Sequence, residues 1–224
     1  DKTAIFEFDV NESKEGKLIF EHDEVDVSGL MYSKKRKVLT GVNYTLAKRD
    51  VEFFDSWREN IQNKLEKKLP GYEVGITSFS KDETKAVIVT YSDKSRGTYY
   101  YYNVENDKLT ELGKISPWLN EDHMAGMKPI TYKSRDGLTI HGYLTLPKGS
   151  NRKNLPVVVN PHGGPWARDT WGYRPEIQFL ANRGYAVFQM NFRGSTGYGR
   201  KFWEISFKEW GKSMQDDITD GVQW

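Results

Sequence analysis

The 224-residue chain contains no cysteine, which excludes disulfide bonds and thiolate chemistry. It has no apolar run near the roughly 20 residues that a membrane-spanning helix needs. Its formal net charge is only +2, from 33 basic and 31 acidic residues scattered along the chain. This balance argues against nucleic acid or a membrane as the main partner. The opening DKTAIFEFDV has neither region of a signal peptide, and we expect it to be a strand within a longer protein, which leaves the compartment open.

Several motifs of catalysis and cofactor binding are also missing. The glycines of FRGSTGYG (192–199) do not fit G-x-G-x-x-G, and WGKS lacks the upstream glycine of a P-loop. No serine lies in G-x-S-x-G, since Ser195 has Arg193 two positions before it and Ser213 has Gln215 two positions after it. No pair of the four histidines has metal-ligand spacing. We therefore predict no cofactor, no metal site and no nucleophile elbow in these residues.

The first half of the chain repeats with a period in the forties. YSKKRKVLTGVNY (32–44) aligns with FSKDETKAVIVTYSD (79–93), and Phe6, Phe53 and Tyr100 are each 47 residues apart. Several short aromatic or β-branched strands per repeat are typical of propeller blades. We predict that residues 1–116 form antiparallel blades, with these three aromatic residues in equivalent strands. The alternative is a chance similarity among strands rich in Tyr, Ser and Lys.

Residues 50–69 interrupt the strand pattern with a helical one. The apolar residues recur at helical spacing, as Phe54, Trp57, Ile61, Leu65 and Leu69. Asp50 is the expected N-cap, and Pro70-Gly71 is the expected stop. We predict a helical insertion that packs this stripe onto a neighbouring blade or domain. A helix that binds a partner or a membrane surface is the alternative, although such stripes are usually core.

After a linker at 117–127, the pattern changes to alternating strands and helices. Asp136-Gly137 predicts a hairpin turn, and LPVVVN (155–160) and YAVFQMN (185–191) predict strands buried in one parallel sheet. Helices are expected at 174–184 and over 200–224, the latter broken near Gly211. Such alternation produces right-handed crossovers, so residues 128–224 are predicted to be α/β.

The loop Pro161–Pro165, which follows the first of these strands, is the main candidate site. Its His162-Gly163-Gly164 sequence can turn two backbone N–H groups toward one point, as an oxyanion hole requires. A phosphate-binding turn is the alternative, but the loop lies at the strand end where open α/β sheets bind ligands. Further along the chain, Asp216, Asp217 and Asp220 could hold a metal, but we expect them to serve the helix dipole and nearby backbone groups.

Four stretches resemble, in order, the prolyl oligopeptidase family of serine peptidases, in its acylaminoacyl-peptidase and dipeptidyl-peptidase-like branch. They are KPITYKSRDGLTIHGYLTLP, PVVVNPHGGPWARD, LANRGYAVFQMNFRGSTGYGRKF and WGKSMQDDITDGVQW. The resemblance implies the last blades of a β-propeller followed by the N-terminal part of an α/β-hydrolase domain. It also implies that the catalytic serine, in G-x-S-x-G-G, and then the Asp and His of the triad follow DDITDGVQW. The intact protein should cut short peptides, with the propeller limiting access, and the 224 residues alone should be inactive.

The resemblance also assigns expected roles to a few residues. Gly163 and Gly164 match the oxyanion loop, and His162 stands where other branches have a tyrosine that helps to bind the oxyanion. Trp166 and Arg168 could line the substrate entrance, and Arg193 with residues 194–199 matches a structural loop. Short peptides and the rest of the protein's own two domains are the expected partners, and the oligomeric state is left open. An esterase-like hydrolase and a non-catalytic scaffold that has lost its nucleophile remain alternatives.

Overall fold

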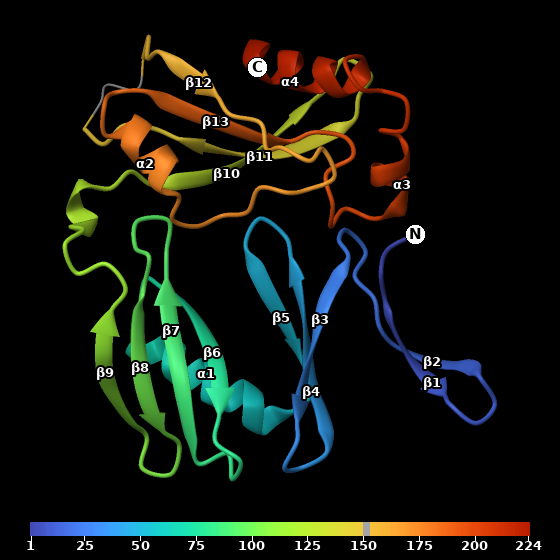
Figure 1. Cartoon of the computed structure of the whole chain (residues 1–224), viewed down its shortest axis with the longest axis vertical. Helices are drawn as coiled ribbons and strands as arrows, with labels where there is room; N and C mark the ends of the chain where they lie inside the picture. Colours follow the sequence, from blue (N-terminus) through green and yellow to red (C-terminus); the bar gives the residue numbers. More distant parts are fainter. Residues whose placement is uncertain (150–152) are drawn as a thin grey trace.

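The structure is a computed structural model, and it describes residues 1–149 and 153–224. Before residue 115, the described residues form three separate antiparallel sheets, of two, three and four strands (Figure 1). The strands are β1 (Ile5–Asp9), β2 (Lys14–Phe20), β3 (Val27–Ser33), β4 (Val38–Thr45), β5 (Arg49–Phe53), β6 (Glu73–Phe79), β7 (Lys85–Tyr91), β8 (Thr98–Asn103) and β9 (Lys108–Lys114).

The 47-residue repeat is confirmed in the pairing of the strands. Phe53 in β5 pairs with Gly41, and Tyr100 in β8 pairs with Ile88, which follows Gly41 by the same 47 residues. Both aromatic residues therefore lie in the third strand of their sheets, at the same register. Equal spacing in the sequence has produced equal positions in two sheets.

The third copy of the repeat lies at the N-terminus. Phe6 is in β1, and the β1–β2 hairpin corresponds to the β8–β9 hairpin, because both strand pairs are joined by turns of the same form. Ser13 and Asp107 end these turns, and both have a positive φ, of 50° and 55°. The β1–β2 hairpin thus matches the last two strands of the four-stranded sheet.

Helix α1 (Ser56–Lys68) follows the third strand of the three-stranded sheet. In the four-stranded sheet, the corresponding place in the chain is taken by the fourth strand, β9. The prediction of Asp50 as N-cap is wrong, because Asp50 pairs with Tyr44 inside β5. Asp55 caps the helix instead, and its side chain accepts a hydrogen bond of 2.9 Å from the backbone N–H of Arg58. The ladder with β4 holds the chain extended through residue 53, so the helix starts later than its apolar pattern indicates.

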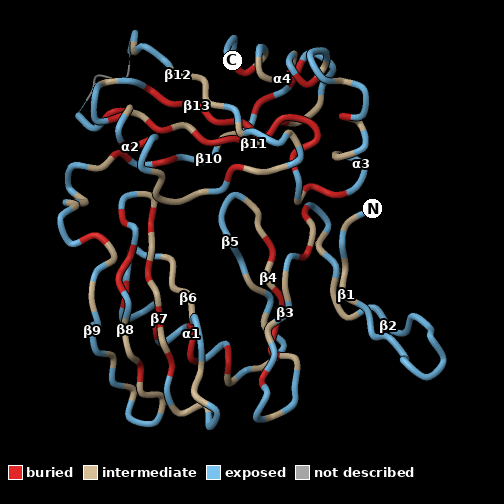
Figure 2. Tube along the Cα trace, in the orientation of Figure 1, coloured by how far each residue is buried: buried red, intermediate tan, exposed pale blue. Residues whose placement is uncertain are grey.

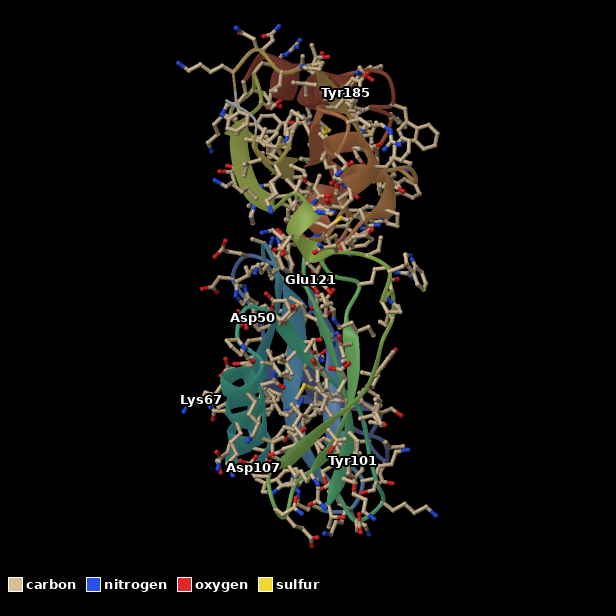
Figure 3. The ribbon with its side chains drawn as sticks, turned by 90° about the vertical axis from the view of Figure 1, so that its left-hand side faces the viewer. Asp50, Lys67, Tyr101, Asp107, Glu121 and Tyr185 are labelled. Carbon is tan, nitrogen blue, oxygen red and sulfur yellow. The ribbon has the colours of Figure 1, made fainter. Side chains whose placement is uncertain are left out.

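The stripe of α1 packs onto the four-stranded sheet, as predicted. Ile61, Leu65 and Leu69 are buried in one cluster with Ile88 and Tyr102 of that sheet. Phe54, which was expected in the stripe, precedes the helix and is exposed. Lys67 on the opposite side of α1 points outward (Figure 3).

Residues after 115 form a mixed sheet with helices, which lies above the ends of the other sheets (Figure 1). Its strand order is β10-β11-β13-β12, in which only the β12–β13 pair of the described strands is parallel. The elements are a short 3-10 helix (Glu121–His123), β10 (Met127–Lys133), β11 (Thr139–Thr145), β12 (Val157–Val159), α2 (Pro175–Ala181), β13 (Ala186–Asn191), α3 (Arg200–Glu204) and α4 (Ser213–Gln223). The described helices include none that is long and apolar enough to cross a membrane.

Most of the expected elements of this half are present. The hairpin turns at Asp136-Gly137, where Gly137 has a φ of +87°, and a break at Gly211 separates α3 from α4. β12 and β13 lie in the same sheet, as predicted, and β13 is buried along its whole length (Figure 2). The expectation that β12 is equally buried is wrong. It has a neighbour on one side only among the described strands, and Val157 is 55% exposed.

The turn between β4 and β5 joins the two halves of the molecule. The Tyr143 hydroxyl donates a hydrogen bond of 2.8 Å to the carbonyl of Ala47. The ammonium group of Lys48 lies 3.8 Å from the ring centre of Trp171. Glu121 lies in the covalent connection between the two tiers of the molecule (Figure 3). The lower tier contains the sheets before residue 115, and the upper tier contains the mixed sheet. The candidate loop lies on the upper tier, close to this junction.

Candidate active site

The loop Pro161–Pro165 leaves the sheet at the carboxyl end of β12. The Asn160 N–H donates to the Phe188 carbonyl at 2.8 Å, which anchors the start of the loop to β13. The helix expected at 174–184 is present as α2, which starts at Pro175. The intervening residues have no regular structure, so the site rests on individual contacts rather than on a helix terminus.

The backbone of the loop has the free donors that an oxyanion hole needs. Gly163 and Gly164 are exposed, and neither of their N–H groups has a hydrogen-bond acceptor within the described parts of the chain. Gly164 has a φ of +134°, and a Cβ there would lie 2.8 Å from the backbone nitrogen of Trp166. Only glycine therefore fits this position without strain. At Gly163 a Cβ would meet nothing within 4 Å.

His162 is fixed against the neighbouring loop at 192–199. Its ring stacks on Phe192, with the ring centres 4.7 Å apart and the planes 16° from parallel. Its Nε2 lies 2.8 Å from the Ser195 hydroxyl, which donates its own proton to the Phe192 carbonyl at 2.7 Å. Nδ1 lies 3.0 Å from the Gly163 carbonyl, and the tautomer of the ring decides which nitrogen donates. Both ring nitrogens thus contact the protein, and the ring holds the shape of the loop.

Ser195 contacts a histidine, as a catalytic serine does, but a substrate could not reach its hydroxyl. Its side chain is completely buried, and its proton is used in the turn that starts at Phe192. The sequence had excluded it by the missing elbow motif, and the burial gives the physical reason. The contact between His162 and Ser195, 33 positions apart, had no signal in the sequence.

The acidic cluster of α4 supports the 192–199 loop. Asp217 is fully buried and accepts from the Arg193 side chain at 2.8 Å and 2.7 Å, in a two-bond fork. Arg135 donates to Asp220, and these bonds lower the pKa of Asp220 to about 2. The expected structural role of these carboxylates is confirmed, but their partners are arginine side chains as well as backbone groups. No cluster suited to a metal ion occurs in the described residues.

Trp166 and Arg168 lie on different sides of the loop. Trp166 is half exposed, donates from Nε1 to the Ser206 hydroxyl at 3.2 Å and contacts Trp203 edge-on. Arg168 donates to the Leu46 carbonyl at 2.6 Å, and its guanidinium lies 4.1 Å from the ring centre of Tyr198. Arg168 therefore joins the loop to the β4–β5 turn. That these two residues line a substrate entrance stays a prediction.

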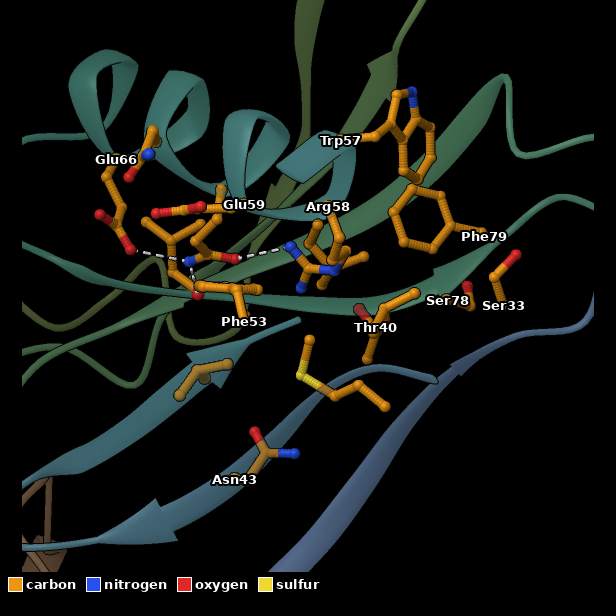
Figure 4. A pocket seen from close by; sticks show the side chains of 18 of the residues that line it. Ser33, Thr40, Asn43, Phe53, Trp57, Arg58, Glu59, Glu66, Ser78 and Phe79 are labelled. Carbon is orange, nitrogen blue, oxygen red and sulfur yellow. Dashed lines mark hydrogen bonds between the residues drawn. The ribbon is translucent and has the colours of Figure 1, made fainter. Parts of the chain in front are cut away.

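A second feature, a cavity, lies between the sheets of the first half (Figure 4). It has a volume of about 1400 Å³ and is lined by residues of β3, β4, β5, α1 and β6. Arg58 of α1 lies in its wall, with only 8% of its surface exposed. Sequence reasoning missed Arg58, because one arginine within an amphipathic helix gives no signal of burial.

Known proteins similar to this chain agree with the fold. Residues 171–224 match the model of the prolyl oligopeptidase family. Dipeptidyl aminopeptidase BIII of Pseudoxanthomonas mexicana is 34% identical over 99% of this chain and 33% of its own length. The chain belongs to the prolyl oligopeptidase family. The family match starts after the candidate loop, but the similarity to the Pseudoxanthomonas enzyme spans nearly the whole chain, the loop included.

Two further proteins extend the comparison. Dipeptidyl peptidase family member 6 of Caenorhabditis elegans is 28% identical over 99% of this chain and 32% of its own length. A puromycin-hydrolyzing peptidase of Mycobacterium tuberculosis has a similar structure, with a TM-score of 0.66 over 94% of this chain and 33% of that chain. At 19% identity, this last similarity concerns the fold alone. The chain spans about a third of the length of the curated relatives it matches.

Proposed function

We propose that the intact protein is a serine peptidase that hydrolyses short peptides through an acyl-enzyme. The observation that carries the proposal is the pair of exposed glycines, Gly163 and Gly164, whose N–H groups have no hydrogen-bond acceptor among the described residues. Donors held in this way stabilise the negative charge that develops on a carbonyl oxygen in acyl transfer. Membership of the prolyl oligopeptidase family and the names of the dipeptidyl peptidase relatives support a peptide substrate.

The proposed division of the chain follows from this function. Residues 1–116 are the last blades of a propeller that limits substrate access, with the helical insertion α1. Residues 117–127 are a linker, and residues 128–224 are the first part of an α/β-hydrolase domain. The 47-residue repeat and the mixed sheet support this division. Around the loop, Trp166 and Arg168 are the proposed entrance residues, and His162 orients the loop beside the substrate.

The nucleophile and its partners must come from other residues of the intact protein. The 224 residues contain no G-x-S-x-G, and Ser195 is buried with its proton already used. Without a serine activated by a histidine there is no acyl-enzyme route, however well the loop is formed. The 224-residue chain alone is therefore expected to show no turnover of peptides or esters.

The test is Gly164→Val in the intact protein, which misdirects the loop without removing a side chain. Valine is strained at a φ of +134° and would collide with the backbone of Trp166. Loss of one oxyanion donor lowers kcat by about 10²–10³-fold, with KM little changed, because the bond strengthens mainly in the transition state. Gly137→Val is the control, since Gly137 also has a positive φ, of +87°, but lies in a turn away from the loop.

Three outcomes would contradict the proposal. A folded Gly164→Val protein with near-normal kcat would make the loop structural. Turnover by the 224-residue chain alone would require a nucleophile elsewhere in it. Faster cleavage of simple esters than of any short peptide by the intact protein would favour an esterase.

A further inference from the structure

The cavity between the sheets lies apart from the proposed active-site loop. It is enclosed by the three-stranded sheet β3–β5, by the edge of the four-stranded sheet at β6 and by α1 (Figure 4). Its lining combines aromatic side chains, such as Trp57 and Phe79, with polar ones, such as Thr40 and Asn43. With a volume of about 1400 Å³, it has room for a small organic molecule.

Arg58 brings a positive charge into this cavity with no carboxylate in ion-pair contact among the described residues, although Glu66 and Asp55 raise its pKa from a longer distance. Its guanidinium lies 5.4 Å from the ring centre of Phe53 and 5.9 Å from that of Phe79. Nη1 donates to the Gln62 side chain at 3.2 Å, and within the described residues Arg58 forms no ion pair. Burial lowers the pKa of Arg58 to about 10, as expected for a cation held away from water with little compensation.

The neighbouring Arg36 already has carboxylate partners. The Gln62 amide donates to the Glu66 carboxylate at 2.8 Å. Glu66 is therefore connected to Arg58 only through the Gln62 side chain. Arg36, also in the cavity wall, pairs with Asp55 at 2.6 Å and with Glu83 at 3.1 Å. Even so, Nη2 of Arg36 is buried without a hydrogen-bond partner in the described parts of the chain. Two guanidinium groups of one cavity thus have unused donors.

These features select a ligand chemistry. A guanidinium presents a planar set of donors that matches a carboxylate in two-bond geometry. Because Arg58 has no ion-pair partner among the described residues, one carboxylate would match its charge, and Glu59 and Glu66 in the lining disfavour a multiply charged phosphate. The aromatic rings beside Arg58 suit an apolar body. We propose that the cavity binds an organic monocarboxylate with an apolar or aromatic body, and that Arg58 holds its carboxylate.

The proposal goes beyond the peptidase reaction, because the site needs no group of the active-site loop. The carboxylate could belong to a free organic acid or to the C-terminus of a peptide. Both sources offer the same group to Arg58, and they differ in whether amide groups precede it. Calorimetric titration of the intact protein with 3-phenylpropionate and with N-acetylglycyl-phenylalanine separates the two sources by their affinities.

The central experiment compares N-acetyl-phenylalanine with its amide, which lacks the charge but has nearly the same shape. We expect the acid to bind at least about tenfold more tightly than the amide, since hydrogen bonds between charged groups are the strong ones. Arg58→Met should abolish this preference. Arg49→Met is the matched control, because Arg49 lines the same cavity but is exposed, and it should leave the affinity unchanged.

Equal affinity for acid and amide would overturn the proposal, and so would equal loss in both arginine variants. Binding of the acid that survives Arg58→Met would belong to another site, such as the active site, and would leave the peptidase proposal untouched. Should Arg58→Met fail to fold, Arg58→Lys retains the charge and most of the stem but not the two-bond fork. It is expected to weaken binding about tenfold, and unchanged affinity in that variant would equally overturn the proposal.

Discussion

At the scale of the residue, one buried carboxylate holds the loop behind the candidate active site. Asp217 accepts from the Arg193 backbone N–H at 2.9 Å as well as from its guanidinium. It also accepts from the Ser134 hydroxyl at 2.7 Å, which ties the β10–β11 hairpin to the same point. Arg193 lies in the same loop as Ser195, and Ser195 contacts His162 next to the two glycines. The position of the glycine loop therefore depends on Asp217.

Asp217→Asn should destabilise the protein by about 3 kcal/mol, because it leaves the buried Arg193 guanidinium without its main counter-charge. Urea unfolding followed by tryptophan fluorescence measures the change. Asp216→Asn is the control, since the Asp216 side chain is 41% exposed and pairs with the more exposed Arg135. It should cost no more than about 1 kcal/mol. A similar loss of unfolding free energy in the two variants would show that the buried Asp217–Arg193 pair contributes no more to stability than the exposed pair.

His141 should make stability fall as the pH falls below neutrality. It lies in β11 against Tyr198, and burial, with the nearby charge of Arg168, lowers its pKa from 6.5. The unfolded chain therefore takes up this proton first, so stability is lost as the pH falls through 6.5, until the folded form is protonated too. His141→Phe should flatten this slope in unfolding experiments between pH 7 and pH 5, taken as about the range of histidine titration. His123→Gln, at an exposed position, should retain it.

At the scale of the element, α1 shows how tertiary packing decides where a helix begins and what it covers. It is rich in helix formers such as Glu, Lys and Leu, but a helix of this length is marginal by itself, and the face that packs on the four-stranded sheet stabilises it. Leu65 is completely buried in that face, among Ile88 and Tyr102. Arg58 lies nearer the start of the same helix and faces the cavity.

Leu65→Ala should reduce the free energy of unfolding by about 2–5 kcal/mol, through lost apolar burial and the cavity left behind. The measurement is chemical unfolding at constant temperature. Lys64→Ala changes the adjacent, exposed residue and should stay within about 0.5 kcal/mol of the unaltered protein. If Leu65→Ala costs less than about 1 kcal/mol, the neighbouring side chains have filled the space that Leu65 leaves. That result would mean that this cluster does not hold α1.

At the scale of the whole molecule, the two tiers are joined by polar contacts and by a small apolar cluster, in which Tyr198 packs with Val25 and Tyr44. Arg168 and Tyr143 both donate to carbonyls of the β4–β5 turn, at Leu46 and Ala47. On the other side, the Gln178 amide donates to the Asp93 carbonyl at 2.8 Å. The candidate active-site loop thus has its position set partly by a turn of the other tier.

Arg168→Met should loosen the contact between the tiers, because a charge-assisted hydrogen bond contributes about 1.5–3 kcal/mol. We expect faster amide hydrogen exchange in the β4–β5 turn at 46–48, with little change in the centre of the mixed sheet. Arg174→Met is the control, since the Arg174 side chain pairs with Asp169 of its own tier, at 3.8 Å. Unchanged exchange in the turn of the Arg168 variant would show that the tiers are held by other contacts.

Periodic and local features could be predicted from the sequence because their causes are local. The 47-residue spacing of Phe53 and Tyr100 sets equal strands at equal register. The turn at Gly137 follows from a backbone conformation that glycine adopts freely, and Gly211 lies within the break at 205–212 that separates α3 from α4. The paired glycines of the loop at 161–165 were visible in the same way, and Gly164 does adopt a positive φ, whereas their role in an oxyanion hole stays a prediction.

Only the tertiary structure decided which distant side chains meet. Asp55 rather than Asp50 caps α1, because pairing with β4 keeps the chain extended up to that point. The contact of His162 with Ser195 and the burial of Arg58 beside a cavity had no counterpart in any pattern of the chain. Spacing along the chain reports periods and turns, whereas a contact across many residues depends on how whole elements pack. The free energy of that packing is shared over many side chains at once, so no single stretch of sequence contains it.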